Sequence, residues 1–141
     1  MHKGLPLLLR LAQQETDEKQ GDLGHAARSS AEAAKALEVH DAEAANEAHR
    51  ALSEPDALIA MATWLPHAAR SRAPLQRRAT ELDRREDTAR EALREAIARR
   101  KRLELALEAI QVEHQRQTTR RAEQQADERE RERAIRADSE R

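Results

Sequence analysis

Cysteine, phenylalanine and tyrosine are absent from this chain, and Trp64 is its single aromatic residue. Without cysteine the chain can form neither disulfides nor thiolate metal sites, which fits a reducing compartment. Without large aromatic side chains, and with alanine supplying much of the apolar content, it cannot fill a thick interior at native packing density. These absences exclude a disulfide scaffold and argue against a large globular core.

Proline, glycine, net charge and long apolar runs are also scarce. The chain has 3 Gly and 4 Pro, and 26 Lys and Arg residues balance 27 Asp and Glu residues, so no overall basic field attracts nucleic acid. The leucine run near the start is interrupted by Arg10 and has no small-residue cleavage site, so we expect the first turns of a helix there. No stretch approaches the roughly 20 apolar residues of a membrane span, so we expect any membrane contact to be peripheral.

What the chain does have is charge, 38% of its residues, together with Ala, Leu, Glu and Arg in quantities typical of long helices. Its second half also carries a seam, which we define as residues spaced alternately four and three apart from Leu75 to Ile110. Nine of these eleven positions are apolar. The seam residues are Leu75, Ala79, Leu82, Glu86, Ala89, Leu93, Ala96, Arg100, Leu103, Leu107 and Ile110. This heptad spacing predicts a coiled coil with one other helix.

Prolines and glycines divide the chain into three parts within a single all-α domain, residues 1–141. A first helix is expected over about 6–53, with a weak point at Gly21 and Gly24. A short proline-bounded helix is expected over about 54–73, which we call the tip segment, with Ser53 as its N-cap. A second helix is expected over about 74–135, and Pro66 and Pro74 should interrupt or kink the chain before it.

Two long helices joined by a short segment predict an antiparallel hairpin. Facing residues should then have numbers that add to about 119, which places Leu37 beside Leu82 and the reversal near residue 60. In this register the residues after about 115 have no partner within the chain. We call that C-terminal part of the second helix the overhang.

Catalytic and metal sites are not predicted by the pattern of polar residues. No two histidines lie three or four residues apart, and a two-helix rod offers no dry cavity that would shift the pKa values of its carboxylates. We therefore expect neither enzymatic activity nor a cofactor, a metal ion or a small-molecule substrate.

Three stretches of the chain resemble the FliJ family of bacterial flagellar type III export. The first is the opening LLLRLAQQETDEKQGDL, the second is ARRKRLELALE, and the third is EQQADE near the C-terminus. The resemblance implies a stalk-like coiled-coil hairpin in the cytoplasm, peripheral at the inner face of the cell membrane. It further implies that the export ATPase ring and the membrane protein of the export gate are the partners, with export chaperones as a further candidate.

The resemblance also implies where these partners bind. The surface facing the ATPase ring would comprise Leu8, Leu11, Glu15, Arg102, Gln117, Arg121, Gln124 and Asp127. The surface facing the gate would comprise Leu58, Met61, Trp64 and Leu65, in the tip segment. From the residues alone, the bulky apolar cluster of this segment has two readings, a plug that closes the hairpin and a knob that binds a partner. The cluster comprises Leu58, Ile59, Met61, Trp64 and Leu65.

Two other classes of function stay open at this level. A self-associating structural coiled coil would pair its seams between chains rather than within one. A peripheral membrane protein would lay an amphipathic helix on a lipid surface, although a narrow, alanine-rich seam inserts weakly.

Overall fold

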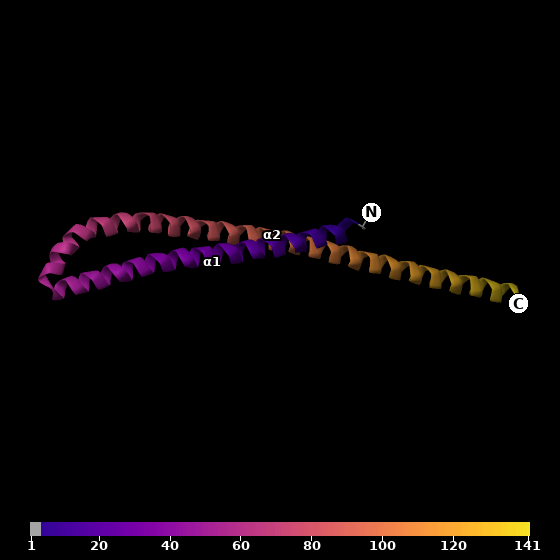
Figure 1. Ribbon diagram of the computed structural model, residues 1–141. Coiled ribbons are helices and arrows are strands. Elements are labelled where there is room, and N and C mark those ends of the chain that lie inside the picture. Colours follow the sequence, from indigo (N-terminus) through magenta and orange to yellow (C-terminus); the bar gives the residue numbers. More distant parts are fainter. Residues whose placement is uncertain (1–3) are drawn as a thin grey trace. The chain divides into compact units, whose positions relative to one another are not determined.

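The computed structural model describes residues 4–141, which form two helices. Helix α1 spans Gly4–Ser53 and helix α2 spans Pro55–Ser139. Of the described residues, only Glu54, Glu140 and Arg141 lie outside a helix. The two helices pack against each other (Figure 1), which confirms the predicted all-α helical hairpin.

The chain divides into two compact units, each of which contains part of both helices. One unit is Gln13–Ala98, and the other combines the chain up to Ala12 with Arg99–Arg141. Each unit has its own contacts between the helices, and each is described by itself below.

The chain reverses at Glu54, within the unit Gln13–Ala98. The residue before a proline disfavours the helical conformation, which fits the end of α1 just before Pro55, and Pro55 then occupies the first position of α2, where its missing N–H costs nothing. The first backbone bond of α2 runs from the amide of Leu58 to the carbonyl of Glu54, at 3.3 Å. The predicted cap at Ser53 is wrong, because its hydroxyl donates back to the carbonyl of His49 at 3.5 Å. No described residue has a positive φ, so the reversal needs no glycine.

The two internal prolines do not end α2. Pro66 and Pro74 lie inside the helix, and both are exposed, so water can reach the carbonyls that lose a backbone donor. Figure 1 shows α2 curving through its first turns before it runs beside α1. The tip segment is therefore the curved beginning of α2 and has no helix end near residue 73.

Burial along α2 follows the predicted seam. All eleven seam residues are buried or half-buried, and Ala96 is only 1% exposed. On α1, the same alternating steps of three and four lead from Thr16 to Ala44 through residues that are all buried or half-buried. Each helix therefore turns one narrow stripe away from solvent, as heptad spacing requires.

Both helices depart from strict heptads near the reversal. On α1 two successive steps of four join His40, Ala44 and Ala48, and on α2 two such steps join Trp64, Ala68 and Arg72. Four extra residues in a heptad pattern locally unwind the pairing of helices. The same irregularity occurs on both helices, so their buried residues continue to face each other near the reversal. The buried stripe of α2 therefore extends into the tip segment instead of stopping at residue 75.

Asp41 and Arg72 form an ion pair between the helices and reveal the register. Arg72 donates from Nε to Oδ1 of Asp41 at 2.8 Å and from NH2 to Oδ2 at 3.2 Å, and its NH1 donates to Gln76 at 2.7 Å. The guanidinium of Arg72 holds the pKa of the Asp41 carboxyl below its ordinary value, chiefly through this hydrogen bonding. The pair is partly exposed, so its contribution to stability is modest, and it serves as a marker of how the two helices are aligned.

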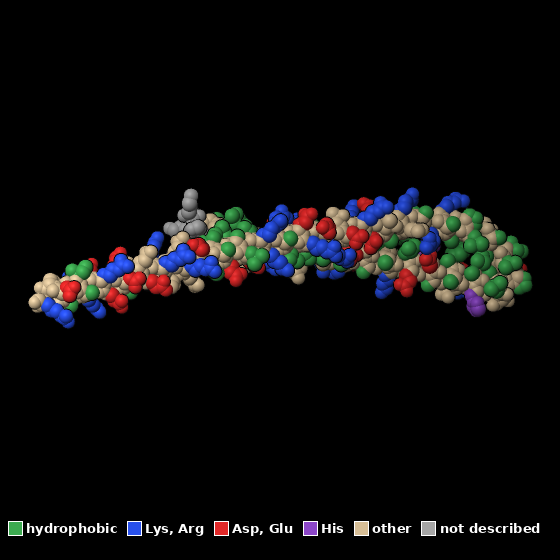
Figure 2. Space-filling model, turned by 180° about the vertical axis from the view of Figure 1, so that it is seen from behind, with side chains coloured by type: hydrophobic (Ala, Val, Ile, Leu, Met, Phe, Trp, Pro, Cys, Tyr) green, Lys and Arg blue, Asp and Glu red, His purple; other side chains and the backbone are tan. Residues whose placement is uncertain are grey.

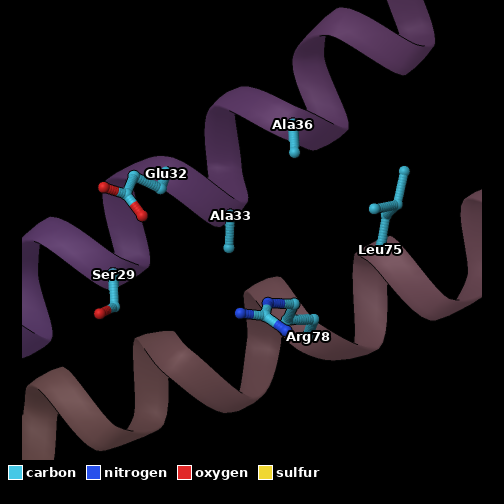
Figure 3. A pocket seen from close by; sticks show the side chains of 6 residues that line it. All are labelled: Ser29, Glu32, Ala33, Ala36, Leu75 and Arg78. Carbon is cyan, nitrogen blue, oxygen red and sulfur yellow. The ribbon is translucent and has the colours of Figure 1, made fainter.

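The predicted register was wrong by about one heptad. The numbers of Asp41 and Arg72 add to 113 rather than 119. A hollow between the helices supports the same alignment: Ala33 and Ala36 of α1 line it together with Leu75 and Arg78 of α2 (Figure 3). A heptad seam looks alike when it is shifted by seven residues, so only the position of the reversal at Glu54 selects the true register.

The hollow in Figure 3 exists because α1 presents small side chains to α2. Ser29, Ala33 and Ala36 leave a space of about 380 Å³, toward which Leu75 and Arg78 extend from the opposite helix. Residues immediately before a seam position, such as Ala36 and Arg78, thus lie on the same edge of the hairpin.

In the unit containing Arg99–Arg141, α2 extends past the part of α1 that belongs to this unit. Ile110 is the last half-buried residue of α2, and every residue from 111 to 141 is exposed. The overhang therefore begins near residue 111, slightly earlier than the predicted 115, as the shifted register requires.

We expect Gly21→Ala to stabilise the protein by about 1 kcal/mol, because alanine has the higher helix propensity. A Cβ at Gly21 would meet no atom within 4 Å outside its own helix backbone. Urea denaturation followed by circular dichroism measures the change. The exposed Ala31 offers the reverse exchange, and Ala31→Gly should destabilise by a similar amount; a destabilising Gly21→Ala would contradict this account of α1.

The Asp41–Arg72 pair predicts a pH dependence. Because the folded-state pKa of Asp41 is lowered, its contribution to stability is present above the unfolded value of about 3.9 and is lost as pH falls through the folded value. The difference in unfolding free energy between the wild type and Asp41→Asn should therefore shrink below about pH 4. Glu38→Gln, at an exposed position one turn earlier, should show no comparable difference at neutral pH.

Candidate interaction surfaces

Two of the predicted tip residues point toward α1. Met61 and Trp64 are half-buried and belong to the stripe that α2 turns away from solvent. Together with Glu47, Ala57 and Ala60 they line a hollow of about 250 Å³ near the reversal. Met61 and Trp64 thus match the reading of the cluster as a plug.

The other two predicted tip residues point outward. Leu58 is 55% exposed and Leu65 is 50% exposed. Leu52 and Ile59 are more exposed still, at 81% and 73%. Figure 2 shows apolar side chains gathered at this end of the unit, where α1 meets α2. We call Leu52, Leu58, Ile59 and Leu65 the tip patch.

The tip patch includes two residues that the predicted gate-facing set lacks. The signal for Ile59 is in the sequence, because no Asp, Glu, Lys or Arg occurs between Asp56 and Arg70. A helix without charges over that length has apolar side chains on its outer face as well as on its inner face. Leu52 has no such signal, because its exposure depends on α1 ending at Ser53.

The residues predicted to face the ATPase ring divide between the two units. Leu8 and Leu11 are 51% and 52% exposed and lie on the outer side of α1, whereas Leu5, Leu9 and Ala12 are more buried. In the same unit, the predicted residues of α2 are all exposed. These are Arg102, Gln117, Arg121, Gln124 and Asp127. Glu15 belongs to the unit Gln13–Ala98, where it is half-buried.

Histidines and carboxylates do not gather into a ligand set in the described part of the chain. Among residues 4–141, no three His, Asp or Glu side chains lie close enough together to hold a metal ion. The candidate sites are therefore surfaces, an apolar one at the tip and a polar one on the overhang.

We expect substitutions at the tip to separate into two classes. Met61→Ala should lower the unfolding free energy by about 1–2 kcal/mol, because a half-buried side chain is lost from the contact between the helices. Ile59→Ser should change it by less than about 0.5 kcal/mol, because the side chain is mostly exposed. Fluorescence of Trp64, the single aromatic residue, reports unfolding of the tip in both variants. Equal destabilisation by the two changes would contradict the division into inner and outer faces.

Comparisons of the chain with protein-family models, with curated proteins and with solved structures gave no match.

Proposed function

We propose that this chain is a non-enzymatic component of the flagellar type III export apparatus, similar to the FliJ family. The three resembling stretches and the two long helices that pack against each other support this proposal. In this role the hairpin is a stalk-like coiled coil that engages the export ATPase ring and the export gate, and it contributes to the escort of export chaperones.

Coiled-coil packing between α1 and α2 is part of the proposal. Its support is the pattern of burial, which follows alternating steps of three and four residues on both helices. Neighbouring charges stabilise the exposed faces of α2, for example Arg85 with Glu81 at 2.7 Å and Arg94 with Glu91 at 3.6 Å.

The observation that carries the proposal is the overhang. Residues 111–139 are helical, yet all of them are exposed, and Gln117, Arg121, Gln124 and Asp127 lie among them. A long polar helix with no cover from the rest of the described chain is suited to a larger partner such as a ring. We propose that it engages the ring together with the exposed leucines Leu8 and Leu11.

The tip patch supports the second contact. Its four large apolar side chains are each at least half exposed, which is unusual in a chain this polar. We propose that Leu58 and Leu65, with Leu52 and Ile59, meet the export gate. Met61 and Trp64 then hold the tip in shape from the inner side rather than binding the gate themselves.

The proposed mechanism needs no catalytic residue on this chain. An asymmetric rod inside a ring touches the ring subunits unequally, and each subunit shifts toward the conformation that its contact favours. ATP hydrolysis in the ring would then change through differential binding alone.

The proposed location is the cytoplasm, peripheral at the inner face of the cell membrane. None of the described helices is long and apolar enough to cross a membrane. In this proposal the gate protein, and not an insertion of this chain, holds it near the membrane.

A self-associating structural coiled coil is the alternative from another class. Within one chain, the apolar seam of α2 already packs against α1. Two chains could pair through their seams only if each hairpin opened first. A helix that lies on lipid is the third possibility, and vesicle binding by the tip patch would indicate it.

Truncation tests the proposal. A chain that ends at Gln115 should keep the helix content of the paired region but should no longer stimulate a purified export ATPase, because most of the overhang is removed. Rates of phosphate release with the full and shortened chains measure this. The Leu58→Ser variant is the control, because it alters the other surface and should stimulate normally. Undiminished stimulation by the shortened chain would refute the assignment of the overhang to the ring.

A further inference from the structure

The overhang keeps the spacing of the seam but loses its apolar character. Beyond Ile110 the successive steps of four and three lead through polar residues and reach Ile135. The positions between them are His114, Gln117, Arg121, Gln124, Glu128 and Arg131. Ile135 is 69% exposed, which leaves a large apolar side chain in water at a seam position.

A hollow lies where the apolar seam ends. Leu107, Ile110 and His114 line it together with neighbouring polar residues of α2, and its volume is about 760 Å³. Its lining residues and Ile135 belong to the same unit but lie far apart along one straight stretch of helix, so Ile135 cannot reach the hollow of its own chain. A second copy of the chain, however, supplies an Ile135 that can.

We propose that two copies of this chain pair antiparallel through their overhangs, with Ile135 of each copy seated against Ile110 in the hollow of the other. This inference goes beyond the proposed function and does not depend on it. The symmetry is isologous, because the same surface of both copies is used and the contact occurs twice.

The seam fixes the details of this pairing. When Ile110 meets the partner's Ile135, facing seam residues have numbers that add to 245, which places Gln117 beside the partner's Glu128 and Arg121 beside the partner's Gln124. If one overhang is moved along the other, seam residues again face seam residues only after a shift of seven residues.

Charges at the edge of the seam select among these shifts. Arg120 and Asp127 each come directly before a seam position. Within the hairpin, Ala36 and Arg78 also come directly before seam positions, and they lie on the same edge of the helix pair. We expect Arg120 and the partner's Asp127 to share an edge in the same way. In the proposed register Arg120 lies beside the partner's Asp127, and the same contact recurs by symmetry. A shift of seven in one direction places Arg120 beside the partner's Arg120, and in the other direction Asp127 beside the partner's Asp127. Like charges therefore oppose both neighbouring registers.

The paired state would cover residues that the proposed function assigns to the ATPase ring. Gln117, Arg121 and Gln124 lie in the middle of the pairing, so a copy paired in this way cannot present them to another protein. Pairing and ring binding are then mutually exclusive uses of one helix.

Crosslinking tests the register directly, because the natural chain has no cysteine. We expect a short thiol-reactive crosslinker to join Gln117→Cys chains to Glu128→Cys chains when the two are mixed, and to join neither variant to itself. The matched control is Thr119→Cys mixed with Ala126→Cys, which lies at the same level but on the outer face and should not crosslink. Crosslinking of Gln117→Cys to itself would indicate parallel chains and would overturn the proposal.

Sedimentation equilibrium of the full chain tests the contacts. We expect a dimer whose dissociation constant rises more than about tenfold in Ile135→Ser, because an apolar contact is lost twice. Val112→Ser is the control, because Val112 is also exposed on α2 but faces away from the seam. Arg120→Glu and Asp127→Arg should each weaken the dimer, and the double variant should restore it. A chain that stays monomeric, or a dimer unaffected by Ile135→Ser, would refute the proposal, and neither result depends on an ATPase.

Discussion

The burial of one narrow stripe on each helix is the interaction on which this structure depends. The chain has no aromatic core and no disulfide, so the contact between α1 and α2 is its main means of removing apolar surface from water. The buried apolar residues of the described chain are all alanines, for example Ala33 and Ala96, so each layer contributes little. Stability must accumulate over many layers, which explains why the helices are long.

That constraint also explains the irregular features near the reversal. Glu54 and Pro55 end one helix and start the next within a single residue, and the chain must then return its seam to the partner helix. Exposed prolines inside α2 and a local departure from heptads on both helices accomplish this. As a consequence, the same segment packs Met61 and Trp64 inward and leaves the tip patch in water.

The two surfaces proposed for binding differ from the buried stripe in different ways. On the overhang the stripe has no partner helix, and at the tip patch apolar residues lie outside the stripe. The apolar side chains of the tip patch point away from the partner helix. The overhang keeps the heptad spacing of the seam, but with polar side chains. An export stalk and a self-paired state both use the overhang, so they compete for one helix. The isolated Ile135 and the hollow at Ile110 distinguish the second use from a merely solvated end.

The sequence by itself determined the helices, the seam and the uncovered C-terminal end, because heptad spacing and the scarcity of glycine and proline act locally. The tertiary structure decided the register, since a heptad pattern accepts any shift of seven and only the reversal at Glu54 removes that freedom. The Asp41–Arg72 pair followed from the register and had no signal of its own. The inward or outward direction of each tip residue likewise required the curvature of α2, because a charge-free helix gives no indication of which side faces its partner.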